Sequence, residues 1–403
     1  MTGDGSVVAA TPIRRARQKS RRLAEIIEAG ARLMYSRGFA STSVADVTAE
    51  VGVAPSALYR YLPGKEKLLA AVLDRRFTDY EDALQDCQGW DDVADRLTPI
   101  AVAHRDLGVL WQREARAMAV DDYDALALRL RAIARGISEL LDGPGDGPPP
   151  IARAWSTISI LTSLSYHSTT VSRERLLRLL PQLIRAVGAH LVEGPPHGSW
   201  SAQPIASVAP PLADEDLDDT DLAILDAAMR LYGAKGYHQV TMADLGEAVG
   251  MAGPSLYHRY DSKSTVLAAV LNRAGLRLNA DARGVLDGAA DSVTAMRGLL
   301  HSYARLVTTE PHVVEALLSE GARRPDGDRR PVAEQHDRYV KIWSRQLRRC
   351  VPALPAGEAM ARVYAGITVV NDLSRTHSTR AELSVDALCD LAWAAMSAGL
   401  ALR

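Results

Sequence analysis

The chain has 403 residues, 47% of them hydrophobic and 24% charged, and this composition excludes a disordered or fibrous chain. At about 150 residues per domain, the length excludes a single small module and favours two or three domains. The 47 basic and 49 acidic residues nearly cancel, which excludes a uniformly basic nucleic-acid coat but allows segments of opposite charge.

The first 20 residues are predicted to form a basic, disordered arm. This arm carries Arg14, Arg15 and Arg17, whose charges suit DNA phosphates or an adjacent minor groove. A tail that only improves solubility is the alternative. No apolar segment follows these arginines, so they do not belong to a signal peptide.

A duplication dominates the chain. Residues 26–73 align without a gap with residues 224–271, and both copies end in Leu-Ala-Ala-Val-Leu. Farther along, Ala152-Arg153 and Leu164-Ser165 resemble Ala361-Arg362 and Leu373-Ser374. The copied unit therefore extends over about 200 residues, as expected for a chain built from structural repeats.

Apolar residues recur at helical spacing throughout both copies, and we therefore expect an all-α fold. Each half of the chain is predicted to hold a three-helix helix-turn-helix domain followed by a helical-bundle regulatory domain. The expected boundaries are 21–68 and 69–193 in the first half, 194–219 for a Pro-rich and acidic linker, and 220–266 and 267–403 in the second half.

Within each copy, the second helix is predicted to begin at a capping box. The first copy pairs Ser43 with Asp46, and the second pairs Thr241 with Asp244. A glycine then supplies the tight turn before the third helix, which reads Pro-Ser-Ala-Leu-Tyr-Arg-Tyr in the first copy and Gly-Pro-Ser-Leu-Tyr-His-Arg in the second. Leucine in each third helix is expected to face the core.

The pattern G-[VM]-x(4)-L-Y-x(5)-K, preceded by [ST]-x-x-D, resembles the DNA-binding domain of TetR/AcrR-type bacterial transcriptional regulators over 48 residues in each copy. The resemblance implies double-stranded DNA as partner. With the capping residues Ser43 and Thr241, the expected DNA-facing residues are Ser56, Ala57, Tyr59, Arg60, Tyr61 and Lys65, and Pro254, Ser255, Tyr257, His258, Arg259 and Lys263.

These residues are expected to divide between phosphate and base contacts. The expected phosphate contacts are Tyr59, Tyr257, Lys65 and Lys263, and the expected base contacts are Ser56, Arg60, Ser255 and His258. The alternatives are helix packing for the tyrosines and a solvated charge for the lysines.

The second copy departs from the family pattern. Arg259 stands where the family usually has an aromatic residue or histidine, and the acidic run 214–221 precedes the copy. In the first copy, Leu62 fills a place usually held by an aromatic residue. Because DNA repels carboxylates, we expect the second copy either to bind DNA more weakly or to have its acidic linker directed away from DNA.

The regulatory halves are expected, from the resemblance, to bind a small apolar effector among their helices. Packing in the core is the alternative for each candidate. The candidates are Trp111, Trp155, Tyr166 and His167 in the first half, and Tyr303, His312, Trp343, Tyr364 and Asn371 in the second.

The family usually acts as homodimers, and two halves in one chain allow an intrachain pseudo-dimer or a homodimer. The pseudo-dimer is favoured and predicts an asymmetric operator, because the two third helices differ. The alternative is a ligand or protein sensor in which only the first helix-turn-helix reads DNA.

No enzyme, cofactor or metal site is predicted, since the scattered histidines form no HExxH motif and no GxSxG motif occurs. Cys87, Cys350 and Cys389 are too widely separated for a disulfide framework and favour a reducing compartment. The expected location is the cytoplasm, with no membrane partner, because no run of about 18 apolar residues occurs.

Overall fold

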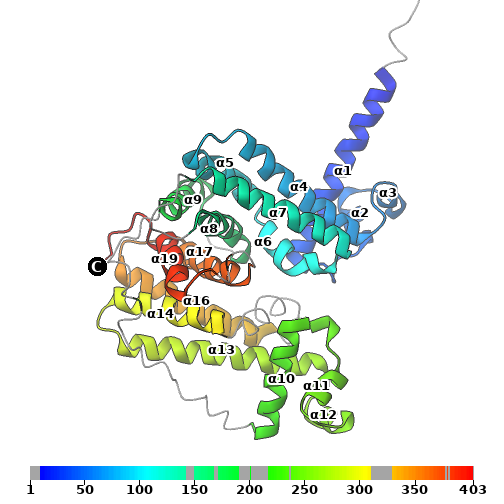
Figure 1. Cartoon of the computed structure of the whole chain (residues 1–403). Helices are drawn as coiled ribbons and strands as arrows, with labels where there is room; N and C mark the ends of the chain where they lie inside the picture. Colours follow the sequence, from blue (N-terminus) through cyan, green and yellow to red (C-terminus); the bar gives the residue numbers. More distant parts are fainter. Residues whose placement is uncertain are drawn as a thin grey trace, which may run out of the picture. The chain divides into compact units, whose positions relative to one another are not determined.

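The computed structural model describes residues 10–141, 149–167, 171–189, 200, 217–235, 237–309, 329–376, 379 and 382–402. The described residues form helices and helical turns without a β-strand, which confirms the all-α prediction (Figure 1). Among them, no helix combines the length and the apolar character that crossing a bilayer requires. The chain divides into two compact units, Met1–Asp86 with His104–Ile133 and Cys87–Ala103 with Ala134–Arg403.

The first compact unit holds the first helix-turn-helix. Its helices are α1 (Ala10–Arg37), α2 (Val44–Val51), α3 (Pro55–Tyr59), α4 (Lys65–Gln85), α6 (Leu107–Val109) and most of α7 (Val120–Glu139). Residues 10–20, expected to be a disordered arm, instead form the start of α1. The only proline of this segment lies in the first helical turn, where its missing N–H breaks no hydrogen bond, so the helix is not interrupted.

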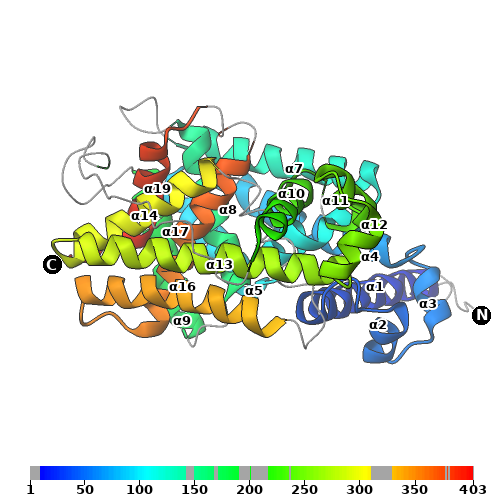
Figure 2. The ribbon, with the colours of Figure 1, turned by 90° about the horizontal axis from the view of Figure 1, so that it is seen from below.

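The second compact unit holds the second helix-turn-helix and most of the regulatory helices. They are α5 (Trp90–Ala103), α8 (Pro150–Thr162), α9 (Arg173–Gly188), α10 (Asp219–Lys235), α11 (Met242–Ala248), α12 (Gly253–Arg259), α13 (Lys263–Gly288), α14 (Ser292–Thr309), α16 (Arg329–Cys350), α17 (Ala356–Arg375) and α19 (Val385–Ser397). Helix α13 is long: α10, α11 and α12 gather at one end of it, while α14 and α16 pack along the rest (Figure 2).

The regulatory part of the first half, expected as one domain over 69–193, is divided between the two compact units. Helices α5, α8 and α9 belong to the second compact unit. The reason is packing: α8 contacts α17, and α9 contacts α19, so helices from both halves share one core (Figure 1). Buried apolar residues such as Leu179, Leu183 and Leu391 form part of this core.

The same buried contact occurs once in each half and shows that the duplication reaches the regulatory helices. Arg153 on α8 donates to the carbonyl of Gly188, at the end of α9, at 2.6 Å. Arg362 on α17 donates to the carbonyl of Ala398, just after α19, at 2.9 Å. In both halves an arginine thus satisfies carbonyls that a helix C-terminus leaves without intrahelical partners. The weak sequence similarity around Arg153 and Arg362 therefore corresponds to the same structural contact in both halves.

The linker predicted over 194–219 lies outside the described residues except for Trp200 and residues 217–219. Trp200 is buried, and its indole N–H donates to Asp390 Oδ1 at 2.7 Å. The guanidinium of Arg297 lies 4.1 Å from the Trp200 ring centroid. This linker residue is therefore anchored on α14 and α19, a contact that the Pro-rich composition did not reveal.

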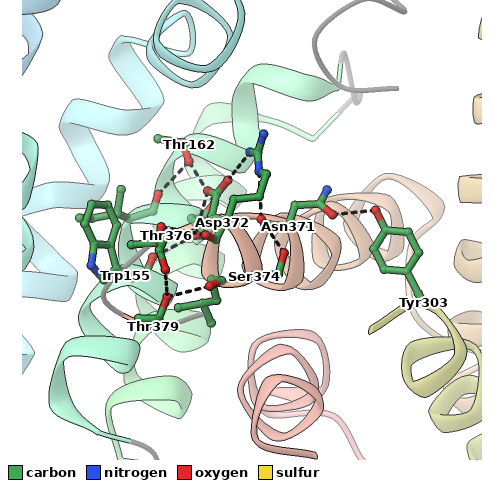
Figure 3. Close-up of polar contacts among 12 residues, drawn as sticks. Trp155, Thr162, Tyr303, Asn371, Asp372, Ser374, Thr376 and Thr379 are labelled. Atoms are coloured by element: carbon green, nitrogen blue, oxygen red, sulfur yellow. Dashed lines mark hydrogen bonds and ion pairs between the residues drawn. The ribbon is translucent and has the colours of Figure 1, made fainter. Parts of the chain in front are cut away.

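A buried carboxylate lies where α8 meets α17. Asp372 on α17 accepts a hydrogen bond from Ser159 Oγ on α8 at 2.9 Å and pairs with Arg375 at 3.1 Å (Figure 3). Burial nevertheless raises the pKa of the Asp372 carboxyl above its ordinary value of 3.8. Desolvation therefore outweighs both partners in setting the protonation of this group.

Replacing Asp372 with asparagine is expected to remove a pH dependence of stability. Because the folded pKa lies above the unfolded one, the contribution of Asp372 is present below about pH 4 and is lost as the pH rises through the folded pKa. Urea unfolding of the wild type and of Asp372→Asn, at pH values from below 4 upward, measures this pH dependence of the free energy of unfolding. A constant difference between wild type and Asp372→Asn at every pH would contradict it.

Candidate nucleic-acid interface

Both helix-turn-helix domains are built by the same local signals. Ser43 and Asp46 form a capping box, in which Ser43 Oγ accepts the Asp46 N–H at 3.1 Å and Asp46 Oδ2 accepts the Ser43 N–H at 2.8 Å. Thr241 and Asp244 repeat it with distances of 3.1 and 2.7 Å. The hydroxyls of Ser43 and Thr241 also donate to these carboxylates, and together with the backbone N–H groups they lower the pKa of both carboxyls. The capping boxes are confirmed; DNA contact by Ser43 and Thr241 stays a prediction.

The turn between the second and third helices requires glycine in both copies. Gly52 and Gly250 each have φ of 68°, a left-handed conformation that a side chain disfavours. The third helices, α3 and α12, follow this turn. Their leucines, Leu58 and Leu256, are fully buried, which confirms that this position faces the core.

The outer faces of α3 and α12 carry the residues expected at DNA. Tyr59 and Tyr257 are 59% and 52% exposed, so neither is a packed core residue. Exposed side chains also include Ser56 and Arg60 in the first copy, and Pro254, Ser255 and His258 in the second. Ala57 lies on α3, and Tyr61, just after α3, is half-buried. Both faces can therefore approach a groove, although contact with DNA stays a prediction.

Lys65 and Lys263 have a role inside their domains that sequence reasoning missed. Lys65 Nζ donates to the Phe39 carbonyl at 2.7 Å and lies 4.1 Å from the centroid of that ring. Lys263 Nζ donates to the Tyr237 carbonyl at 2.8 Å and lies 4.3 Å from its ring centroid. Each lysine thus ties the start of the fourth helix to the turn after the first. They are not the freely solvated charges of the alternative, and a phosphate role for them gains no support from these contacts.

The two third helices differ in how their arginines are paired. Arg60 is exposed and makes no ion pair with any residue that the structure describes. Arg259 instead pairs with Asp218 at 2.8 Å and with Asp221 at 3.0 Å. Both carboxylates belong to the acidic run that was expected to repel DNA; its last members pair with Arg259 instead.

The arginines of the predicted arm, Arg14, Arg15 and Arg17, lie within the N-terminal part of α1. Their helical backbone replaces the flexible segment that was expected to follow a minor groove. Farther along α1, Arg32 pairs with Glu50 of α2 at 2.6 Å, so this arginine fastens the domain together.

The effector candidates of the first half belong to both compact units. Trp111 belongs to the first compact unit, where it stacks on Tyr123 with ring centroids 5.2 Å apart. The other candidates, Trp155, Tyr166 and His167, belong to the second compact unit, where Trp155 and His167 are buried and Tyr166 is half-buried. Effector binding by these four residues stays a prediction.

Three candidates of the second half do lie together. Tyr303 on α14 donates from its hydroxyl to Asn371 Oδ1 on α17 at 2.7 Å (Figure 3). The rings of Tyr303, Trp343 and Tyr339, a residue that was not predicted, have centroids 5.8 to 6.0 Å apart. Burial raises the pKa of Tyr303 to about 12. These side chains contact one another, as expected of an aromatic core.

The remaining candidates fall elsewhere. Tyr364 contacts residues of both halves: its ring centroid lies 5.0 Å from that of His167, and its hydroxyl lies 3.4 Å from His336 Nε2. His312 lies outside the described residues.

Comparison with known proteins matches both helix-turn-helix domains to one family. The family of "Bacterial regulatory proteins, tetR family" matches residues 26–72 and 224–270. The HTH-type transcriptional repressor KstR2 of Rhodococcus jostii (strain RHA1) is 26% identical over 192 residues, which are 47% of this chain and 85% of that protein. The HTH-type transcriptional repressor ComR of Escherichia coli (strain K12) is 43% identical over 51 residues, 13% of this chain and 24% of that protein.

Among solved structures, a TetR-family transcriptional regulator from Bordetella parapertussis 12822 is similar, with 19% identity and a TM-score of 0.41. The match covers 44% of this chain and 93% of that one.

Proposed function

This chain belongs to the TetR family of bacterial transcriptional regulators and carries the DNA-binding domain of that family twice, and we propose that it is a repressor working as a single-chain pseudo-dimer. It reads an asymmetric operator, because its two third helices present different side chains to DNA. A small apolar effector releases it by changing the spacing of these helices.

The observation that carries the pseudo-dimer is the packing of unlike halves within one compact unit. Helices α8 and α9 of the first half meet α17 and α19 of the second (Figure 1). A regulator that needs two copies of its DNA-binding domain therefore has both in one chain, with regulatory helices of the two halves packed on each other. Covalent linkage also holds the second half at an effective concentration of about mM, which reduces the entropic cost of assembly.

The polar contacts at this junction favour pairing of a first half with a second half. Arg175 on α9 pairs with the buried Glu358 of α17 at 2.7 Å, and Ser159 on α8 donates to Asp372 of α17. In the alignment that matches Arg153 with Arg362, Pro149 and Ser163 stand where the second half has the two carboxylates. Pairing of two second halves would take Arg175 away from Glu358 and Ser159 away from Asp372. Loss of such partners from buried carboxylates is energetically costly.

The effector site is proposed in the second half, among α13, α14, α16 and α17. The support is the family resemblance together with the apolar and aromatic character of this bundle, in which Tyr303, Tyr339 and Trp343 cluster. Such surroundings suit an apolar molecule with few polar groups.

Light scattering on the purified full chain, with and without DNA, tests the pseudo-dimer. The probe is the duplex that the wild-type chain enriches from a random-sequence library. We expect a mass of one chain, 43.5 kDa, in solution and one chain on each duplex. Two chains bound to a palindrome through their first copies would contradict the proposal.

A further inference from the structure

The second third helix has its arginine held by two carboxylates from the start of α10. Arg259 Nη2 lies 2.8 Å from Asp218 Oδ2, and Arg259 Nη1 lies 3.0 Å from Asp221 Oδ2. We call Asp218 and Asp221 the acidic clamp. The guanidinium points both of its terminal nitrogens at carboxylate oxygens, which is the geometry by which arginine also binds a phosphate.

Both members of the acidic clamp are positioned by further contacts. Asp218 Oδ1 accepts the backbone N–H of Asp221 at 2.9 Å and so caps the start of α10. The Asp221 side chain is only 17% exposed and also interacts with Tyr260, whose pKa rises to about 12 through burial and this nearby charge. The clamp therefore belongs to the folded domain, since both carboxylates are held by the helix start and by the end of α12.

The first copy has no counterpart of this arrangement. Ser20, Leu23 and Tyr61 occupy the positions that align with Asp218, Asp221 and Arg259. The surrounding charge differs too: residues 21–68 hold seven lysines and arginines against five carboxylates, whereas residues 219–266 hold four against six. The first DNA-binding face is therefore the more attractive to a polyanion.

We propose that the acidic clamp occupies Arg259 in place of a DNA phosphate, so that the first copy supplies most of the DNA affinity. This inference rests on the proposed function and names which half-site dominates the operator. A phosphate that approaches α12 comes within a Debye length, about 8 Å at physiological salt, of the two clamp carboxylates and is repelled by them. To reach the guanidinium of Arg259, the phosphate must displace these carboxylates. The second half-site is then read weakly.

The test compares two substitutions on α10 that each remove one negative charge. Asp221→Asn removes one of the two clamp carboxylates and leaves Asp218 on Arg259, while Asp226→Asn removes a carboxylate that pairs with Arg273 of α13 at 2.7 Å instead. The affinity of each full-chain variant is measured for the duplex that the wild-type chain enriches from a random-sequence library. Circular dichroism checks that α10 is intact.

Removing the Asp221 carboxylate is expected to let a phosphate displace Asp218 from Arg259. Affinity should then rise about three- to tenfold, and the slope of log K against log salt should steepen by about 0.9, the value for one added phosphate contact. The Asp226→Asn control is expected to change both quantities less. In the double variant Asp221→Asn/Arg259→Ala the gain should disappear, because the guanidinium of Arg259 is what contacts the phosphate.

Two results would overturn the inference while leaving the proposed function intact: an equal gain in Asp221→Asn and Asp226→Asn, or a gain that survives Arg259→Ala. If the wild-type chain enriches no duplex, the selection is repeated with Asp221→Asn. Enrichment by that variant alone supports the clamp as the block, and enrichment by neither protein contradicts both proposals.

Discussion

Replacing Arg362 with alanine is expected to lower the free energy of unfolding by about 3 kcal/mol, the lower end of the usual cost of removing one partner from a buried ion pair, because Glu358 keeps Arg175 as a second partner. Arg362 and Glu358 are each only 2% exposed, with Nη2 and Oε1 3.1 Å apart. The guanidinium also donates to the carbonyls of Met396 and Ala398 at the end of α19. Alanine would leave these acceptors in a core where water cannot replace the donor.

The matched control is Arg153→Ala in the first half. Arg153 occupies the corresponding position and donates to the Gly188 carbonyl, but Pro149 stands where Arg362 has its glutamate. Its loss therefore leaves no buried carboxylate behind, and we expect a smaller loss of about 1–3 kcal/mol. Urea unfolding followed by circular dichroism measures both variants. Equal losses would show that the buried ion pair adds nothing at Arg362.

Replacing Arg60 with alanine is expected to weaken binding to the selected duplex by about 10- to 100-fold, the value for losing one good base contact. Arg60 is exposed on the first DNA-binding domain and unpaired among the described residues, so its guanidinium is available to DNA. Gel shifts at fixed salt measure the loss. The corresponding change in the second copy, His258→Ala, is expected to cost less, because the acidic clamp keeps α12 away from phosphates.

Arg32→Ala serves as the control for general loss of charge. Arg32 also lies on the first DNA-binding domain, but it pairs with Glu50 at 2.6 Å and stands outside the third helix. A loss confined to Arg60 assigns that residue to DNA recognition. Losses of the same size for Arg60→Ala and Arg32→Ala would reduce its role to net charge, and equal losses for Arg60→Ala and His258→Ala would show two equivalent readers.

Much of the DNA-binding fold could be predicted from the sequence because its signals are local. The capping boxes, the glycine turns and the buried position of Leu58 each depend on neighbours a few residues away. The duplication required only a comparison of the chain with itself. These features need no knowledge of the path that the chain takes in space.

Some contacts were not predicted because side chains found partners that periodicity does not reveal. The ammonium of Lys65 reaches the Phe39 carbonyl, 26 residues earlier in the chain, while its expected phosphate contact stays a prediction. The basic arm was expected to be disordered, yet α1 extends back to Ala10. Of the effector candidates, Trp111 and Trp155 separated into different compact units.

The sequence by itself determined that the chain is a tandem pair of helix-turn-helix regulators, because capping, turn and repeat signals are contained in short segments. Only the tertiary structure decided which residues of the two halves contact one another. Asp218 meets Arg259 across 41 residues, Arg175 meets Glu358 across 183, and Ser159 meets Asp372 across 213. Such pairs depend on where helices cross after folding, and no local pattern fixes the crossing of two helices so far apart in the chain.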